Sequence, residues 1–249
     1  PLKEIQNQLK KNNQHLAFEP TNFSEIFKTS ANEGTIGGTL SCNFSGSRRF
    51  KVGSARDHIL GFKGFNGKGE KIKSGGTVVK NVTGYDLSKL ITGSFGTLVA
   101  LTEITLKVLP KKDTSKTVII YSNSYDEIFE FFNKLSSSSS EISGAAFIPD
   151  FTLDKEFLSK KNSIFKFNDL KSDLSFLAFR VEGDKISIEE KIQNLKKELE
   201  LKRFETSLLD VYQSKPFWRK INNLELFEKT NNNLIRMVVP PANGLKLSK

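Results

Sequence analysis

The sequence predicts an α+β fold built as two units that meet just after residue 110. Fourteen of the 17 glycines lie in residues 1–110. Glycine is used where backbone takes a positive φ or lies close to another group, so this uneven distribution indicates two units with different tasks. Beyond Pro110, strand-like runs alternate with helical periodicity, which is typical of helices packed on a sheet. We therefore expect domains over residues 1–110 and 111–249.

Short elements are expected in the first unit. They are a helix over 2–11, an extended piece over 15–20, a hairpin over 59–72, a helix over 86–91 and a strand over 98–109. Asn66-Gly67 suits a two-residue hairpin turn, because both residues tolerate a positive φ. Leu87, Leu90 and Ile91 should face inward on the helix that ends before Gly93.

The second unit alternates strands and helices. Strands are expected over 117–121, 143–148, 174–181 and 234–239, helices over 124–135, 187–199 and 217–226, and an exposed serine connector over 136–140. Ser124 and Ser187 each precede an acidic residue by three positions, which is the spacing of a capping box. Pro216 should lie near the start of the last helix. This order predicts an antiparallel sheet with helices on one face.

Composition excludes several classes of protein. The longest apolar runs are far shorter than the roughly 20 residues of a membrane-spanning helix. One Cys excludes an intrachain disulfide, and with two scattered His it leaves no metal site to predict. The net charge of +10 favours a polyanionic partner. A nucleic-acid-binding module remains a remote alternative, because the lysines are dispersed rather than gathered beside exposed aromatic residues.

The familiar nucleotide motifs are missing. Gly67-Lys68 is followed by Gly69, so it is not a phosphate-binding P-loop. Gly34 is followed two residues later by Ile36, which breaks the dinucleotide fingerprint. What remains is a side-chain-poor stretch from Gly34 to Gly46. Such backbone can approach a flat or anionic ligand, although a tight glycine turn between core segments explains the same composition.

Several runs, taken in order, resemble a known family. They are Gly34-Thr35-Ile36-Gly37-Gly38, Ser47-Arg48-Arg49, Gly53-Ser54-Ala55-Arg56-Asp57-His58-Ile59-Leu60-Gly61, Lys80-Asn81-Val82-Thr83-Gly84-Tyr85-Asp86-Leu87, Gly93-Ser94-Phe95-Gly96-Thr97-Leu98 and Arg236-Met237-Val238-Val239-Pro240-Pro241. Over about residues 15–110 the chain resembles the second half of the FAD-binding domain of PCMH-type (vanillyl-alcohol-oxidase-like) flavoproteins. Within that superfamily it is most similar to the smaller FAD-binding subunit of bacterial glycolate oxidase, and residues 111–249 then correspond to a cap domain.

The resemblance implies an FAD along residues 34–46, with Gly53-Ser54 near the isoalloxazine and residues 103–104 near the adenine or ribose. The cofactor-binding residues it implies are Gly34, Thr35, Ile36, Gly37, Gly38, Ser45, Gly46, Gly53, Ser54, Gly96, Thr97 and Ile104. Arg48, Arg56 and Lys80 are candidates for positive charge near the flavin, with surface salt bridges as the alternative. Tyr85 is a candidate to stack on the ring, or else a core residue.

The function expected from this resemblance is oxidation of a small 2-hydroxy acid, with electrons passing through FAD to partner subunits. The partners expected are a larger paralogous FAD subunit and an iron–sulfur subunit, in the cytoplasm or peripherally at the inner membrane. Arg180 and Arg236 are candidates to bind the substrate carboxylate, because guanidinium binds carboxylate bidentately. No catalytic residue is assigned. The alternative is a D-lactate-type dehydrogenase or oxidase that consists of one polypeptide, and the resemblance implies that the present sequence is an interior fragment.

Overall fold

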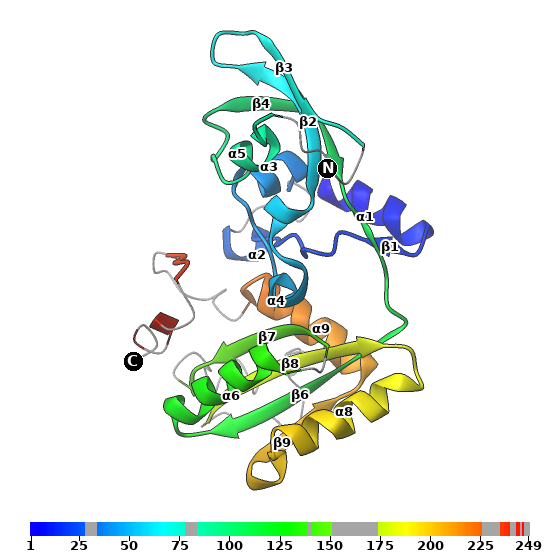
Figure 1. The fold of residues 1–249 in the computed structure, drawn as a ribbon, viewed down its shortest axis with the longest axis vertical. Coiled ribbons are helices and arrows are strands. Elements are labelled where there is room, and N and C mark those ends of the chain that lie inside the picture. Colours follow the sequence, from blue (N-terminus) through cyan, green and yellow to red (C-terminus); the bar gives the residue numbers. More distant parts are fainter. Residues whose placement is uncertain are drawn as a thin grey trace. The chain divides into compact units, whose positions relative to one another are not determined.

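The computed structural model describes residues 1–27, 34–77, 84–138, 141–150, 174–225, 235–239, 243–244 and 246. The fold consists of two compact units, Pro1–Lys111 and Lys112–Lys249 (Figure 1). This division falls where the sequence changes from glycine-rich to glycine-poor. Each unit is described by itself.

Unit 1 is built from short elements around one small sheet. In sequence order they are α1 Leu2–Lys11, β1 Gln14–His15, α2 Ser24–Phe27, α3 Ile36–Ser41, α4 Arg49–Val52, η1 Ala55–Asp57, β2 Ile59–Asn66, β3 Lys71–Gly75, α5 Leu87–Ile91, β4 Val99–Leu106 and β5 Leu109–Pro110. Strands β3, β2 and β4 form an antiparallel sheet in that order, and β1 pairs with β5. The core includes Phe18, Leu40 and Phe62, and the apolar side of α1 packs against it as its periodicity predicts.

The predicted hairpin is confirmed, but its turn is longer than expected. The backbone N–H of Asn66 donates to the carbonyl of Glu70 at 3.0 Å, and Gly69, not Gly67, takes the positive φ of 78°. The side-chain oxygen of Asn66 accepts from the N–H groups of Lys68 and Glu70, which stabilises this wider turn.

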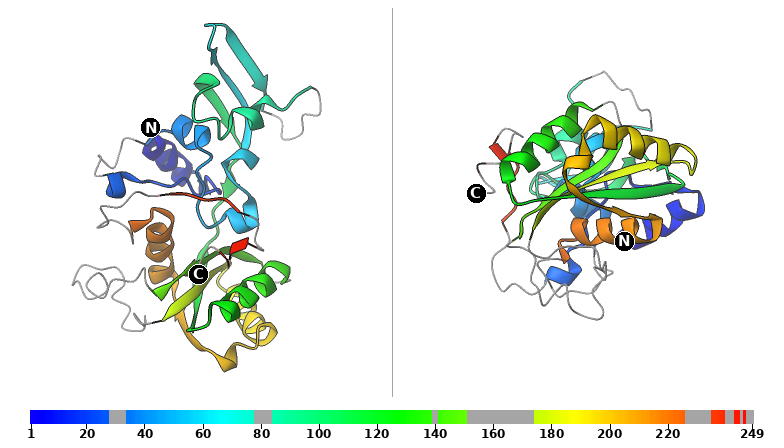
Figure 2. Two further views of the ribbon diagram at one scale, coloured as in Figure 1. Left: turned by 90° about the vertical axis from the view of Figure 1, so that its left-hand side faces the viewer. Right: turned by 90° about the horizontal axis from the view of Figure 1, so that it is seen from below.

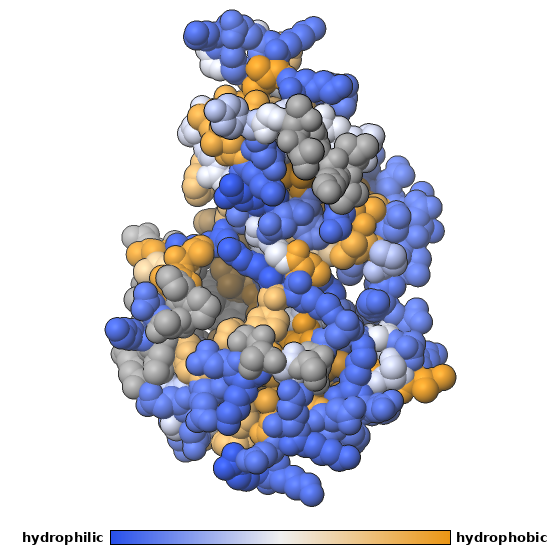
Figure 3. Space-filling model, viewed as in Figure 1, coloured by the Kyte–Doolittle hydropathy of each residue, from blue (hydrophilic) through white to orange (hydrophobic). Residues whose placement is uncertain are grey.

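The short helix α5 forms where it was predicted, but the prediction of its buried face was partly wrong. Ile91 is buried, whereas Leu87 and Leu90 are 37% and 59% exposed. The backbone leaves the helix through Gly93, whose φ is 89°. The face drawn in Figure 3 is mostly hydrophilic, and apolar side chains gather around α5.

Unit 2 is a layered α+β structure. Its elements are β6 Thr114–Ser122, α6 Tyr125–Ser137, β7 Ile142–Ile148, β8 Ser175–Gly183, α8 Ser187–Glu198, η3 Leu201–Arg203, β9 Glu205–Leu209 and α9 Val211–Asn222. The strands pair antiparallel in the order β7-β8-β6-β9. This order, with a helix after the first and third strands, is the ferredoxin-like split βαβ arrangement. It repeats β-α-β twice, and the sequence shows no corresponding repeat.

Helices cover both faces of this sheet, so the prediction of one covered face was wrong. Helices α6 and α8 lie on one side and α9 on the other (Figure 2). Alternate side chains of β6 and β8, among them Ile119 and Phe176, pack with Phe217 and Trp218 of α9. The predicted start of this helix was too late: α9 starts at Val211, six residues before the predicted start.

The helix starts show where the capping predictions succeed. The hydroxyl of Ser124 accepts from the N–H of Glu127, as predicted. Ser187 does not cap α8, because the carboxylate of Asp184 accepts from both its N–H and its hydroxyl, and these bonds lower the pKa of Asp184 to about 2. Asp210 caps α9 in a capping box with Gln213, which is why that helix begins before Pro216.

Two further predictions in unit 2 were wrong, one at a boundary and one in the type of structure. Helix α6 continues to Ser137, into the predicted serine connector. Residues 235–239 are exposed and have no strand assignment, whereas the sequence predicted a strand there. No helix in the described part of the protein is long and apolar enough to cross a membrane.

Candidate cofactor-binding site

The side-chain-poor stretch that begins at Gly34 is not a loop throughout, because residues 36–41 form α3. Thr35 is the residue that starts this helix. Its hydroxyl accepts from the N–H of Gly38 at 3.0 Å, and its carbonyl accepts from both the N–H and the hydroxyl of Thr39 at 3.0 Å. The predicted cofactor surface is therefore one side of a short capped helix and the turn after it.

Gly34 and Gly37 face open space. Among the described residues, a Cβ atom built on either glycine would meet no heavy atom within 4 Å, and neither glycine has a positive φ. The fold itself therefore does not require glycine at these positions. By contrast, a Cβ on Gly61 would lie 2.7 Å from the backbone nitrogen of Gly76. A group lying directly against α3 would explain the two open glycines, so the residues present fit a bound dinucleotide.

Three segments that are far apart in sequence meet at the end of α3. The N–H of Gly93 donates to the carbonyl of Leu40 at 3.1 Å, and that of Phe95 to Ser41 at 2.7 Å. From the other segment, the N–H of Ala55 donates to the hydroxyl oxygen of Ser45 at 2.8 Å. The structure thus brings the predicted residues of 34–46, 53–54 and 96–97 into one region of unit 1.

The turn that starts at Gly53 is held by the carboxylate of Asp57, a residue of the same turn. Gly53 has a φ of 82°, and the N–H and hydroxyl of buried Ser54 both donate to Asp57 Oδ2, at 2.7 and 3.0 Å. Partial burial raises the pKa of Asp57, but the two hydrogen bonds from Ser54 outweigh it, so the net pKa is below its usual value. Because the Ser54 hydroxyl donates to Asp57, the residue presents mainly backbone to a ligand.

His58, which follows this turn, is 1% exposed. Its Nε2 lies 3.1 Å from the carbonyl oxygen of Val52, and its Nδ1 has no hydrogen-bond partner among the described residues. Burial lowers the pKa of His58, and the hydrogen bond of its ring with the carbonyl of Val52 opposes this only in part. The ring is therefore a neutral core residue that donates through Nε2.

The third segment carries a feature that the sequence reasoning missed. Phe95 has a φ of 55° and is 74% exposed, which is unusual for a bulky residue. Gly96 follows with a φ of 75° and open space around it, and the hydroxyl of Thr97 donates to the carbonyl of Ser94 at 2.7 Å. The flanking glycines, Gly93 and Gly96, were the available signal for this strained turn.

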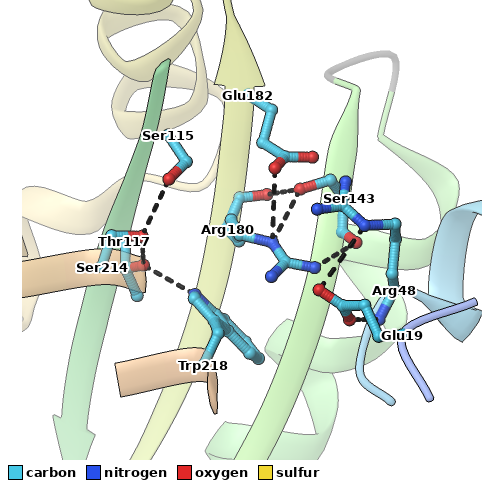
Figure 4. Close-up of polar contacts among 9 residues, drawn as sticks. All are labelled: Glu19, Arg48, Ser115, Thr117, Ser143, Arg180, Glu182, Ser214 and Trp218. Carbon is cyan, nitrogen blue, oxygen red and sulfur yellow. Dashed lines mark hydrogen bonds and ion pairs between the residues drawn. The ribbon is translucent and has the colours of Figure 1, made fainter. Parts of the chain in front are cut away.

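Other predicted residues have varied surroundings. Ile104 pairs with Phe62 across the sheet and its side chain packs against the core, so a ligand could meet only its backbone. Arg48 forms an ion pair with Glu19 at 3.5 Å, which favours the salt-bridge alternative (Figure 4). Arg56 is exposed, and Tyr85 is 92% exposed, so Tyr85 is not a core residue. Lys80 lies outside the described residues.

The two arginines predicted to bind substrate differ in their surroundings. Arg180 is buried; its Nε donates to the hydroxyl of Ser143 at 3.1 Å, and its guanidinium carbon lies 4.8 Å from the ring centre of Trp218 (Figure 4). Glu182 lies 4.0 Å from the same Nε. These contacts favour a structural role for Arg180. Arg236 lies in the exposed segment 235–239.

Comparisons with known proteins identify relatives of part of the chain. It is 44% identical over 115 residues to glycolate oxidase subunit GlcE of Escherichia coli (strain K12), covering 46% of this chain and 31% of that protein. It is 36% identical over 115 residues to glycolate oxidase subunit GlcD of Bacillus subtilis (strain 168), covering 46% and 23%. An uncharacterized FAD-linked oxidoreductase of Mycobacterium tuberculosis (strain CDC 1551 / Oshkosh) is 36% identical over 104 residues, covering 42% and 23%.

The fold is also found among solved structures. An alkyldihydroxyacetonephosphate synthase matches 91% of this chain and 41% of its own, with a TM-score of 0.66 at 19% identity. This likeness confirms the predicted α+β fold. The homologues named above are FAD-linked oxidoreductases and glycolate oxidase subunits. The chain spans less than a third of the length of these relatives. No family model matches it.

Proposed function

We propose that this chain is part of an FAD-binding subunit of a glycolate-oxidase-type enzyme. The whole protein would oxidise a small 2-hydroxy acid and pass the electrons onward through its flavin. The similarity to a glycolate oxidase subunit and to an FAD-linked oxidoreductase supports this proposal.

The observation that carries the proposal is the surface of α3. Gly34 and Gly37 are glycines that the protein's own packing does not explain. They lie on the segment to which the other two predicted cofactor segments are hydrogen-bonded. One flat ligand lying against this region would account for both facts, and the FAD-linked relative supports FAD as that ligand.

Bound FAD would supply a hydride acceptor for the oxidation. The residues of this chain would bind and orient it. Gly34 and Gly37 let the cofactor approach the backbone closely, and the turns at Ser54 and Gly96 border the same region. Arg56 is exposed beside the Ser54 turn, and a cation there would favour the anionic reduced flavin. Arg236, exposed in unit 2, is the stronger of the two candidates for the substrate carboxylate.

We further propose that the protein works in a complex, in the cytoplasm or at the inner face of the membrane. The word subunit in the names of two relatives supports an assembly. The basic excess lies mainly in unit 1, where residues 1–110 hold 15 Lys and Arg against 8 Asp and Glu. Such a surface suits an acidic partner, for which we propose a larger paralogous FAD subunit and an iron–sulfur subunit.

The test begins with the full-length protein that contains this sequence, purified without cofactor, and FAD. Quenching of flavin fluorescence on titration, with saturation at one FAD per protein molecule, would support the proposal. The complex purified with its natural partner subunits is then mixed anaerobically with glycolate, D-lactate or D-2-hydroxyglutarate, and bleaching of the flavin absorption is followed. Fastest bleaching by glycolate is expected. Fastest bleaching by D-lactate would favour the D-lactate-type alternative, and a colourless complex would contradict the flavin assignment.

A further inference from the structure

Two polar side chains hold the turn at residues 53–57 from opposite sides. Asp57 accepts both hydrogen bonds from Ser54, inside the turn. Asn43 lies outside it, and its side-chain oxygen accepts from the N–H of Arg56 at 3.1 Å. Neither residue was predicted to contact the cofactor. Both instead fix the backbone of the turn at residues 53–57, in which Gly53 and Ser54 were predicted to contact the cofactor.

Asn43 occupies a junction between three segments. It lies two residues after the end of α3, its side chain accepts from Arg56, and its Cβ lies 3.6 Å from the place where a Cβ on Gly93 would stand. Its φ of 50° is a conformation that asparagine tolerates better than most residues. The residue therefore combines a turn conformation with a side-chain acceptor, which glycine, the other residue suited to this φ, could not supply.

Asp57 constrains the neighbouring glycine as well as the serine. A Cβ on Gly53 would lie 2.5 Å from Asp57 Oδ2, so the carboxylate fills the space beside the backbone at this position. The Ser54 hydroxyl is turned toward Asp57. Loss of the carboxylate would free both the hydroxyl and the backbone of Ser54 to rotate.

We propose that Asp57 and Asn43 are positioning residues for FAD, acting through the backbone of residues 53–56 rather than by contact. This inference rests on the proposed function. Binding sites depend on such supporting hydrogen bonds, because displacing a contact group by about 1 Å is enough to lose much of its interaction. The two residues fix the orientation of the Ser54 turn relative to α3 before the cofactor arrives.

The test compares FAD dissociation constants of the full-length protein that contains this sequence, at a temperature where circular dichroism shows every variant folded. Asp57→Asn preserves the shape but replaces the charged acceptor of both Ser54 bonds by a neutral amide oxygen, which holds them more weakly, and we expect FAD to bind severalfold more weakly. Asn43→Gly keeps the positive φ and removes only the side-chain acceptor, so a severalfold loss is expected. The absorption spectrum of the remaining bound flavin should also shift, which a purely structural role would not produce.

Asp184→Asn is the matched control. Asp184 in unit 2 also accepts from the N–H and hydroxyl of one serine, Ser187, so the substitution removes the same kind of interaction elsewhere. It should leave FAD binding unchanged. Ser54→Ala alone and in combination with Asp57→Asn completes a double-mutant cycle. Because Asp57 acts through Ser54, the two losses of FAD affinity should be less than additive.

The outcomes separate the two claims. A wild-type protein that binds no FAD overturns the proposed function and this inference with it. A wild-type protein that binds FAD, with Asp57→Asn and Asn43→Gly binding equally tightly, overturns the inference alone. Strictly additive losses in the double variant would also overturn it. If Asp57→Asn does not fold, Asn43→Gly decides between these results.

Discussion

Replacing Gly37 by alanine should make the protein more stable and a poorer binder of FAD. Gly37 is the second residue of α3, has no positive φ, and has open space where a Cβ would stand. Alanine in a helix interior is favoured over glycine by about 0.5–1 kcal/mol. Because α3 is short and Gly37 lies in its first turn, we take the lower value, about 0.5 kcal/mol, which should raise the melting temperature by roughly 2 °C.

The same methyl group should interfere with a cofactor that lies against α3. Inserting a methyl group into a closely packed contact costs about 1–3 kcal/mol, which corresponds to a dissociation constant roughly 5- to 150-fold larger. Stability is measured by thermal unfolding without FAD, and affinity by flavin fluorescence. If Gly37 had only a structural role, Gly37→Ala would change stability and FAD affinity in the same direction. We expect instead a higher melting temperature together with a lower FAD affinity.

Gly67→Ala is the control, because Gly67 is equally open, has no positive φ, and lies in the β2–β3 turn. It should leave FAD affinity unchanged. If Gly37→Ala lowers the melting temperature, a Cβ at residue 37 clashes with neighbouring atoms, which contradicts the open space described beside α3. If Gly37→Ala and Gly67→Ala both bind FAD as tightly as the wild type, the cofactor does not lie there.

Two further predictions concern stability. Thr117→Val should lower the free energy of unfolding by about 1–3 kcal/mol in urea titrations, because it leaves the indole N–H of Trp218 and the hydroxyl of Ser214 without their buried partner, whereas Thr117→Ser should retain most of the stability. The His58 side chain takes up a proton near pH 6.5 in the unfolded protein and only at a lower pH in the folded protein. The contribution of neutral His58 to the free energy of unfolding should therefore be fully present above pH 6.5 and decrease as the pH falls through the pKa of the folded state. Urea midpoints at about pH 7.5 and pH 5 should therefore differ less in His58→Gln than in the wild type; an equal difference would contradict this account.

Local features of the fold could be predicted from the sequence, because local interactions decide them. The start of α6 depends on Ser124 and on residues within one turn of it. The buried stripe of α8 follows from helical spacing, and Ile188, Ile192 and Leu195 are all buried as expected. Where a competing local partner exists, the prediction fails: Asp184 displaces Ser187 as the cap, and Asn66 widens the hairpin turn.

The arrangement of the layers could not be predicted in this way. Helices α6 and α8 pack on one side of the sheet and α9 on the other, although all three carry an apolar side. Which face a helix covers depends on where the backbone enters it after the preceding strand. Thr117 illustrates the difficulty: nothing in its own neighbourhood indicates that its hydroxyl will bind Trp218, about 100 positions further along the sequence.

The candidate site shows the same contrast between what the sequence predicts and what depends on the arrangement of the chain in space. Glycine content drew attention to residues 34–46, but glycine has two separate uses in unit 1. Gly61, Gly64 and Gly75 are required by the fold, since a Cβ on each would lie within 3 Å of neighbouring atoms. Gly34 and Gly37 are not required by it. A sequence cannot distinguish these two uses, because the difference lies in whether another part of the protein fills the space. Gly34 and Gly37 point to a ligand because they are open and also lie on the segment to which the turns at residues 53–57 and 93–97 are hydrogen-bonded.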